Sequence, residues 1–567
     1  MKTALILAIF LMTTLCGIAA PAPAPGPNIF ESTNCTTPEI QIDKLVNRKL
    51  SKLRIQPALC SDAVFVRRAF LDVTGTLPTA KEAREFIKSS DPDKRSALID
   101  RLLERDEYAD YWAMKWGDIL RVKAEFPINL WPNAAQAYHH WIRTSIRDNM
   151  PYDKFVREML TSSGSNFRVG QVNFYRAMQN RTPEGIAAAV ALTFMGSRVE
   201  SWPKNRLPGT AIFFSQVGYK PTREWKEEIV FWDPYKDDPA PAPISATKQS
   251  TNDAAPQATN SVSQPSSNIV TQTAAVKPVP KAPQAPVFPD GTKLKELPPD
   301  IDPRKIFADW LITPQNEWFT ANIVNRIWAW LLGHGIIHEP DDIRPKNPPS
   351  NPELLAYLQT EFVAHNYDMK HIYRLILNSR TYQFSSIPPK PETPKAEINF
   401  AFYPLRRLEA EVLIDAINQI TGTSDLYTSA IPEPFTYIPE NMPAIALPDG
   451  SITSPFLELF GRPARATGME DERVNRVSPT QRMHMLNSSH IQRKLEQGAN
   501  FRKITNPKRT PKEVMDAIYL TILSRFPTED EVKIAETYAK SGVVNGREAW
   551  LDLAWALINS DEFLYRH

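Results

Sequence analysis

The chain has 567 residues, too many for one hydrophobic core, and its 42% hydrophobic and 23% charged residues are typical of a soluble globular protein. Its 66 basic and 64 acidic residues nearly cancel to a formal net charge of +2, which gives no electrostatic footprint for nucleic acid or an anionic membrane. We therefore expect at least two domains and no nucleic-acid partner.

The first twenty residues have the form of a secretory signal peptide. Lys2 supplies the positive start, an apolar run follows, and Gly17 and Ala19 are small residues suited to cleavage. The residue before Cys16 is large, which favours a cleaved signal at residues 1–20 over a lipid anchor on this cysteine. The later chain holds no run of about 20 apolar residues, the length of a membrane helix. The sequence thus predicts an exported protein, periplasmic or secreted, with no transmembrane segment in its mature form.

Two cysteines remain after the signal, Cys35 and Cys60. In an oxidising compartment an even pair usually forms a disulfide, and the alternative is two buried free thiols. Export favours the Cys35–Cys60 disulfide, which would stabilise the fold by about 3 kcal/mol. The spacing fits neither a metal site nor a redox CxxC motif.

Composition divides the rest of the chain. Residues 236–300 contain twelve prolines and many Ala, Ser, Thr and Gln residues. Such a segment buries too little apolar area to offset the entropy of ordering it, so we expect a disordered linker there. It separates an N-terminal domain at residues 35–235 from a C-terminal domain at residues 301–567. The irregular, proline-rich stretch 434–474 predicts a long loop, which in a compact domain is usually functional or disordered.

Both domains are predicted to be mainly α, with few short strands. Thr79 with Glu82, and Thr528 with Glu531, have the spacing of a capping box, in which a hydroxyl and a carboxylate satisfy each other's free backbone donors. These boxes lie in two similar stretches, FLDVTGTLPTAKEAREFI and IYLTILSRFPTEDEVKIAETY. The similarity predicts one helical module used near both ends of the chain, and the alternative is chance resemblance between two capped hairpins.

The densest polar stretch is LLGHGIIHEPDDIRPKNPPSNPELL. His334 and His338 share a face only on a helix, and Gly333, Gly335 and Pro340 argue against a helix there. We therefore assign no metal ligand and expect an ordered turn, whose acidic side chains cap neighbouring helices and pair with nearby arginines. A polar pocket is the alternative, and its candidate residues are Asn325, Arg326, Asp341, Asp342 and Arg344.

No motif assigns a catalytic or cofactor-binding residue. A glycoside hydrolase needs two carboxylates about 5–10 Å apart across a cleft, and the neighbouring Glu470, Asp471 and Glu472 do not establish that geometry. The sequence has no nucleophile elbow, phosphate-binding loop, dinucleotide fingerprint or CxxCH motif.

Longer patterns resemble a known family. The stretch VFVRRAFLDVTGTLPTAKEAREFI is similar to the domain of unknown function 1549. The stretches EWFTANIVNRIWAWLLGHGIIHEPDDIRPKN, RRLEAEVLIDAI and SPTQRMHMLNSS are similar to the domain of unknown function 1553. This pair is typical of exported proteins of planctomycete and verrucomicrobial bacteria. The resemblance implies an exported, mostly helical protein, of a kind discussed beside cytochrome-like and polysaccharide-degrading systems, and it transfers no catalytic residue.

The chain departs from this pattern at one loop. Many relatives carry a CxxCH-type motif after an apolar helix that ends in FLG, whereas here FMG is followed by SRVESWPKNRLPG. Since covalent haem attachment needs that motif, we expect no covalent haem and no other cofactor. We expect Trp202 in this loop either to plug the space or to offer a stacking surface.

Three functions remain after these observations. The leading interpretation is non-catalytic binding of a partner protein or a polysaccharide in the cell envelope. The alternative is an extracytoplasmic hydrolase acting on polysaccharide, which a cleft joining Asp341, Asp342 and Arg344 to the carboxylates of residues 470–473 would favour. A weaker alternative is an accessory to extracytoplasmic electron transfer.

Overall fold

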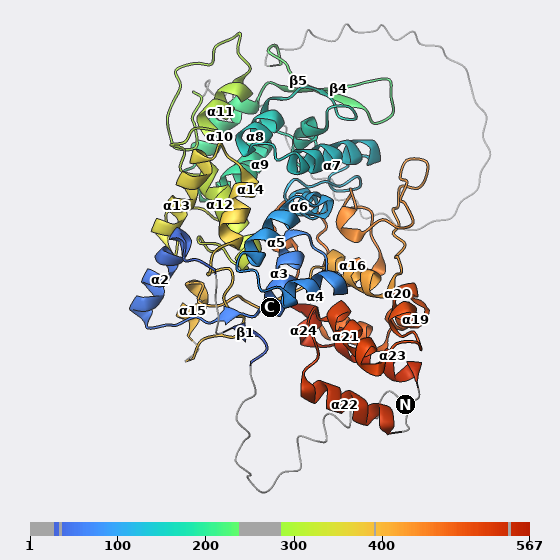
Figure 1. Ribbon diagram of the computed structural model, residues 1–567. Helices are drawn as coiled ribbons and strands as arrows, with labels where there is room; N and C mark the ends of the chain where they lie inside the picture. The colour runs from blue at the N-terminus through green and yellow to red at the C-terminus, as the bar shows by residue number, and fades with distance from the viewer. Residues whose placement is uncertain (1–27, 33–36, 237–284, 391–392, 542–545) are drawn as a thin grey trace, which may run out of the picture.

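The computed structural model describes residues 28–32, 37–236, 285–390, 393–541 and 546–567 (Figure 1). The predicted signal peptide and Cys35 lie outside the described residues, so the cleavage and the disulfide stay predictions, while Cys60 is buried. None of the helices in the described ranges has the length and apolarity needed to cross a membrane.

The N-terminal domain is built almost entirely of helices. In chain order they are α2 (Gln41–Leu53), α3 (Asp62–Val73), α4 (Ala80–Lys88), α5 (Lys94–Leu103), α6 (Asp106–Ile119), α7 (Pro132–Arg147), α8 (Tyr152–Thr161), α9 (Pro183–Met195) and α10 (Arg206–Ala211). Short 3-10 helices lie at η1 (Gly170–Tyr175), η2 (Val199–Ser201) and η3 (Ile212–Phe214).

The C-terminal domain continues in the same style. Its helices are α11 (Pro303–Leu311), α12 (Phe319–Leu332), α13 (Pro352–Ala364), α14 (Met369–Leu377), α15 (Pro394–Ile398), α16 (Ala410–Thr421), α17 (Pro455–Leu459), α18 (Pro479–Asn487), α19 (Ser489–Gln497), α20 (Ala499–Ile504), α21 (Pro511–Ile522), α22 (Glu529–Lys540), α23 (Arg547–Ile558) and α24 (Asp561–Leu564), with 3-10 helices η4 (Ala444–Ala446) and η5 (Glu470–Glu472). The predicted mainly helical class is confirmed.

Strands are few, short and antiparallel, as expected. β1 (Glu31–Ser32) pairs with β2 (Leu59–Cys60), and β6 (Arg406–Arg407) pairs with β7 (Tyr565–Arg566). A three-stranded sheet has the order β3-β5-β4, from β3 (Gly164–Ser165), β4 (Val217–Pro221) and β5 (Glu228–Trp232). In its register Tyr219 lies opposite Val230.

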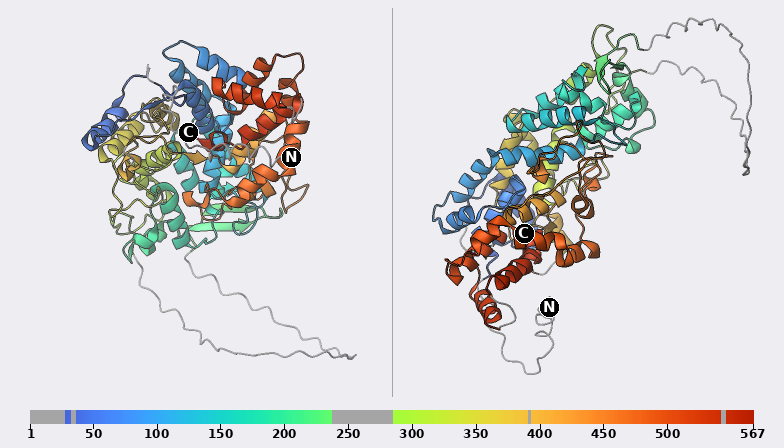
Figure 2. Two further views of the ribbon diagram at one scale, coloured as in Figure 1. Left: turned by 90° about the horizontal axis from the view of Figure 1, so that it is seen from below. Right: turned by 90° about the vertical axis from the view of Figure 1, so that its right-hand side faces the viewer.

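The two domains interleave along one elongated body. α2 packs on α13, α8 on α11, α9 on α12 and α4 on α21, so every one of these contacts joins the two domains. Figure 2 shows α7 to α9 with the β4–β5 hairpin at one end and the C-terminal helices at the other. Trp112 of α6 contacts Trp330 of α12 and Tyr373 of α14, with ring centroids 5.2 and 4.5 Å apart. A single hydrophobic cluster therefore runs through both domains.

The predicted linker is shorter than its composition indicates. Residues 237–284 lie outside the described residues, but 285–300, which we assigned to the linker, are ordered. Phe288 stacks between Phe213 and Trp310 at centroid distances of 4.6 and 5.1 Å. The linker therefore ends before residue 300, which corrects the boundary that we expected. The proline-rich composition continues to residue 300, but the buried ring of Phe288 anchors the backbone ahead of that residue.

The two similar stretches both fold as capped helical hairpins. α3 and α21 each have twelve residues, and in each module a six-residue turn then leads to a helix that begins with a capping box, from Thr79 to Glu82 and from Thr528 to Glu531. The second residue of each turn is left-handed, with φ of +66° at Gly75 and +60° at Ser524. We call α3 to α5 the first module and α21 to α23 the second module.

Candidate functional site

The predicted polar residues form a packed turn. Arg326 on α12 donates to Asp341 at 2.6 Å, and both side chains are almost completely buried. The Asn325 side chain bonds the backbone of Ile337 in both directions, at 3.1 and 2.9 Å. Asp342 and Arg344 pair with each other nearby, at 3.0 Å. The structure thus brings the five candidates together as the ordered turn that the sequence favours, with Asn325, Arg326 and Asp341 in its buried part.

The two histidines of this stretch lie near each other, with ring centroids 6.4 Å apart, but they differ in burial. His334 is mostly buried and stacks on Phe400, with centroids 4.6 Å apart, while the side chain of His338 is exposed. Burial lowers the pKa of His334 to about 4, so this imidazole is neutral at physiological pH. His334 therefore acts as an aromatic packing residue.

The acidic stretch at η5 reaches the same turn from the other side. Asp341 Oδ2 accepts a hydrogen bond from the backbone N–H of Glu470 at 2.7 Å. The Glu470 carboxylate accepts from Trp330 Nε1 at 2.9 Å, and burial raises its pKa. Asp341 thus holds the backbone of Glu470, while the Glu470 carboxylate is bonded to Trp330, so neither carboxylate is free for the work of a glycosidase pair.

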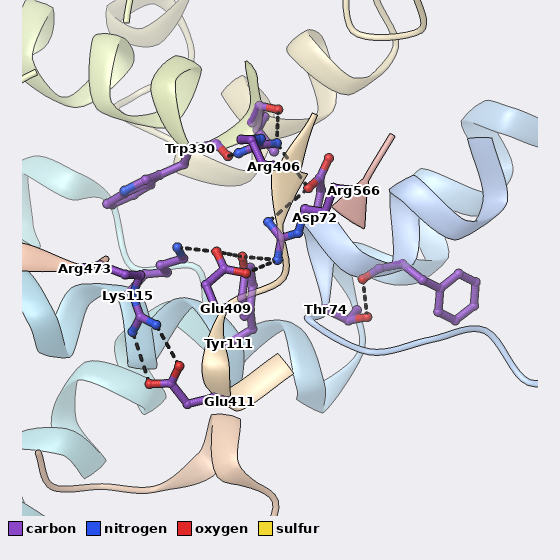
Figure 3. A network of polar contacts seen from close by, with 12 residues as sticks. Asp72, Thr74, Tyr111, Lys115, Trp330, Arg406, Glu409, Glu411, Arg473 and Arg566 are labelled. Atoms are coloured by element: carbon purple, nitrogen blue, oxygen red, sulfur yellow. Dashed lines mark hydrogen bonds and ion pairs between the residues drawn. The ribbon is translucent and has the colours of Figure 1, made fainter. Parts of the chain in front are cut away.

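A network of buried charges ties the two domains together (Figure 3). Arg566 of β7 pairs with Asp72 of α3 at 3.2 Å and with Glu409 at the start of α16. Lys115 of α6 pairs with the same glutamate at 2.7 Å. Asp72 also accepts from two buried tyrosine hydroxyls at 2.8 Å. The last residues of the chain are thereby held to the first module.

The network continues through Arg473, which follows η5. Its guanidinium donates to Glu411 at 2.7 Å (Figure 3) and to Asp118 of α6 at 2.7 Å. Burial alone would raise the pKa of Glu411, but Arg473 holds it at about 2. Arg473 comes from the predicted loop at 434–474, all of which the structure describes, and this residue joins the loop to α6 and α16. Since each of these charges has an oppositely charged partner, the network acts in structure.

One group among the described residues has the make-up of a metal site. Glu361 and His365 lie one helical turn apart on α13, and His371 comes from α14, with ligand atoms all within 4.8 Å of one another. The two imidazoles stack at a centroid distance of 3.6 Å, and His371 pairs with Glu361 at 3.3 Å. Parallel rings cannot both point their nitrogen lone pairs at one ion without turning. As placed, the group is a surface ion pair, and our sequence analysis did not identify it.

The loop after α9 is tied down. Gly196 caps the helix in a left-handed conformation, and its carbonyl accepts from Ile343 N at 2.7 Å. Trp202 is partly buried and donates from Nε1 to Ser197 Oγ at 2.9 Å. The ring therefore packs against its own loop, which is closer to the expected plug than to the expected stacking surface.

The two modules differ in the residues between their first two helices. Phe65 on α3 stacks on Phe86 of α4 with centroids 5.9 Å apart, and both rings are buried. When the Pro-Thr pairs of the two turns are aligned, α21 and α22 carry Val514 and Ala535 at these positions. The second module thus lacks both rings of the pair that fills the first.

A groove lies between α21, α22 and α23, with a volume of about 820 Å³. Met515 and Ala549, which are buried, line it together with the partly buried Val532, Ala535 and Trp550. Exposed charged residues complete the lining: Lys512, Glu529, Lys533, Glu536 and Lys540. The groove is therefore an apolar interior with a rim of mixed charge.

Packing explains why the groove stays open. α4 is held on one side by α3 and on the other by α21, and its Ala83 and Phe86 are buried. α22 makes its main contact with α23 and contributes no buried residue. Figure 1 shows α22 at the outer edge of the molecule. Nothing among the described residues covers the face of α22 that corresponds to the buried face of α4.

The fold and the groove define a mainly helical, two-domain protein with an internal repeat. The family model Protein of unknown function (DUF1549), PSCyt2, matches residues 41–201, and the model Protein of unknown function (DUF1553), PSD1, matches residues 303–539. No curated protein and no solved structure matches the chain. The chain belongs to the family of proteins that carry these two domains in this order.

Proposed function

We propose that this protein is a non-catalytic binding protein whose second module takes up an amphipathic helix of a partner protein. The observation that carries the proposal is the loss of the Phe65–Phe86 pair at Val514 and Ala535. A groove of about 820 Å³ lies beside Ala535, the counterpart of Phe86, while Val514, the counterpart of Phe65, is buried outside its lining. Such a groove accepts the apolar face of a helix, which is a common mode of peptide recognition.

The chemistry of the groove specifies the partner further. The first module fills the corresponding space with a phenyl ring, so we propose that the partner helix presents a Phe or another aromatic side chain. The rim alternates Lys533, Glu536 and Lys540 along α22, which suits charged residues of both signs on the flanks of the bound helix. Burying an aromatic side chain contributes about 1.5–3 kcal/mol and dominates interfaces of this kind.

The same geometry favours a protein over a polysaccharide and binding over hydrolysis. Sugar rings stack on exposed aromatic faces, and Trp550 is the one aromatic side chain among those that line the groove, where it is partly buried. The hydrolase alternative needs two carboxylates that face a cleft. Asp341 and Glu470, which the sequence suggested for that role, are engaged in buried hydrogen bonds.

We propose that this binding takes place outside the cytoplasm, in the periplasm or after secretion. The support is the form of residues 1–20. Fractionation of cells that express the full chain should recover a product shortened by about twenty residues in the periplasm or medium. A full-length product in the cytoplasm would contradict this localisation.

Site-specific photo-cross-linking in living cells tests the proposed partner. Benzoylphenylalanine at Lys533 lines the groove, and the same residue at Glu85, on the exposed face of α4, is the matched control. We expect a cross-link from position 533 to a segment of one protein that has helical apolar spacing and an aromatic residue, and none from position 85. Equal cross-linking from both positions would count against the groove.

A glycan array with the purified mature protein addresses the other class of ligand. We expect no saturable binding to any polysaccharide. Saturable glycan binding without a cross-link at position 533 would replace the protein partner with a polysaccharide.

A further inference from the structure

The group formed by Glu361, His365 and His371 lies where α13 turns into α14, away from α22 (Figure 1). His365 is the C-cap residue of α13, one helical turn after Glu361, and His371 lies in the first turn of α14. Two histidines and one glutamate are a donor set with which proteins bind zinc. The three side chains therefore have both the chemistry and the proximity that a metal ion needs.

The spacing of the donor atoms is that of ligands around one ion. His371 Nε2 lies 3.3 Å from Glu361 Oε2, and His365 Nδ1 lies 3.5 Å from the same oxygen. Ligands about 2.0–2.1 Å from a tetrahedral ion are roughly 3.3 Å from one another, whereas a hydrogen bond between charged groups is about 2.7–2.9 Å long. The pair of His490 with Asp425 has that shorter separation, 2.9 Å. The longer separations at Glu361 leave the distance that an intervening ion requires.

The turn between the two helices fixes the backbone of the group. Asn366 and Tyr367 are both left-handed, with φ of +55° and +58°, so the chain reverses sharply and α14 returns beside the end of α13. The Tyr367 carbonyl accepts from Tyr152 N at 3.0 Å, and Asp368 caps α14 by accepting from the N–H of His371 at 3.0 Å. Only side chains therefore have to move for the group to bind an ion.

One movement is needed before both imidazoles face the same ion. The two rings are stacked with 15° between their planes, and His365 Nδ1 contacts the Glu361 carbonyl at 2.9 Å. The side chain of His365 is 47% exposed, so its ring can turn about the Cα–Cβ and Cβ–Cγ bonds until a nitrogen faces Glu361 Oε2. A cation is favoured at this end of α13, where the helix dipole is negative. The movement exchanges one exposed hydrogen bond for a bond to the metal.

We propose that Glu361, His365 and His371 form a binding site for a divalent ion of the zinc class. Two imidazole nitrogens and one carboxylate oxygen are the protein ligands, and a fourth position is open to water. Imidazole suits Zn²⁺ and its neighbours in the first transition row, whereas Ca²⁺ and Mg²⁺ prefer oxygen ligands alone. The site shares no residue with the groove in the second module, and it adds an ion that the sequence did not lead us to expect.

Calorimetric titration of the mature protein, prepared without a histidine tag, tests the site with ZnCl₂ and with CaCl₂. We expect one saturable Zn²⁺ site per chain and Ca²⁺ binding at least tenfold weaker. No saturable Zn²⁺ binding, or equal affinity for the two ions, would overturn the proposal.

Three variants locate the ion. His365→Ala, His371→Ala and Glu361→Gln should each weaken Zn²⁺ binding at least tenfold. His338→Ala, which removes another exposed histidine beside a glutamate, is the matched control and should leave binding unchanged. Thermal melts check that each variant folds, and Zn²⁺ should raise the midpoint of the wild type and of His338→Ala but not that of His371→Ala. Zn²⁺ affinity at the wild-type level in the three variants would place the ion elsewhere and refute the site.

Discussion

In the first module α3 and α4 enclose a stacked phenyl pair, whereas in the second module α21 and α22 carry a valine and an alanine at the same places and leave a groove. The helix lengths before the turn, the left-handed turn residue and the capping boxes are shared. The helix packing differs as well, because α4 lies on α3 and α21, whereas α22 makes its main contact with α23. Interior positions tolerate such changes only at a cost, unless another molecule fills the space.

The surroundings of the two modules differ in the same sense. α4 is enclosed by α3 and α21, while α22 lies at the edge of the molecule and buries nothing. The buried network around Asp72 and Arg566 fastens the end of the chain to the first module. In the function that we propose, the first module is structural and the second binds the partner.

The largest expected effect comes from breaking the buried network that joins the two domains. Asp72→Asn removes the negative charge opposite Arg566 in a fully buried pair, and we expect a loss of about 3–5 kcal/mol in the free energy of unfolding. Thr521→Ala, at the corresponding and partly buried position of α21, should cost less than about 1 kcal/mol. Denaturant melts of both variants measure the difference, and similar losses at the two positions would show that the modules are equally structural.

The second largest loss of stability is expected when a ring of the phenyl pair in the first module is removed. Phe86→Ala removes a buried ring and leaves a cavity, which should destabilise the protein by about 3–4 kcal/mol. Val532→Ala, on the open face of α22, is the matched change in the second module and should cost less than about 1 kcal/mol. Urea midpoints compare the two. A small effect of Phe86→Ala would mean that the phenyl pair does not hold the first module together.

Acid should weaken the buried ion pairs of Glu411 that help to join the two domains. The folded-state pKa of Glu411, about 2, is below that of an exposed glutamate near 4.3, so the folded state binds fewer protons. Its contribution is fully present above about pH 5 and is lost as the pH falls toward 2, on the order of 3 kcal/mol. Denaturant melts from pH 7 to 2.5 measure the loss, and Glu411→Gln should flatten the curve over this range. If the stability of the variant depends on pH as steeply as that of the wild type, Glu411 does not cause the acid sensitivity.

The smallest effect concerns the caps. Thr79→Ala breaks the capping box of α4 and should cost about 1 kcal/mol of global stability. Thr528→Ala breaks the equivalent box of α22, but since this helix buries no residue, we expect faster amide exchange in α22 with a global change of only a few tenths of a kcal/mol. Exchange measured by mass spectrometry, beside a melt, distinguishes the two results. Equal global losses would mean that α22 is as firmly held as α4.

Local signals were enough to predict much of the fold. The capping boxes at Thr79 and Thr528 and the repeated Pro-Thr turn are contained in short stretches, and each is present as predicted. Composition placed the boundary between the domains, but it could not show that Phe288 ends the linker early, because a single ring finds its partners only in the folded chain.

The site was less accessible to prediction, because its parts are distant in sequence. Asp72 and Arg566 are almost 500 residues apart, and neither stands out among the 130 charged residues of the chain. Ala535 gives no signal of its own, since an alanine on a helix is ordinary. It gains meaning only when the turn at Thr528 is aligned with the turn at Thr79 and the alanine is compared with Phe86.

Filling the groove is the most direct test of the central claim that the second module binds through the space its counterpart fills. Ala535→Phe restores one ring of the phenyl pair to the place it has in the first module. We expect the thermal midpoint to stay the same or rise, and the cross-link from position 533 to the partner protein to disappear. A folded Ala535→Phe protein that still forms this cross-link at the wild-type level would contradict the claim.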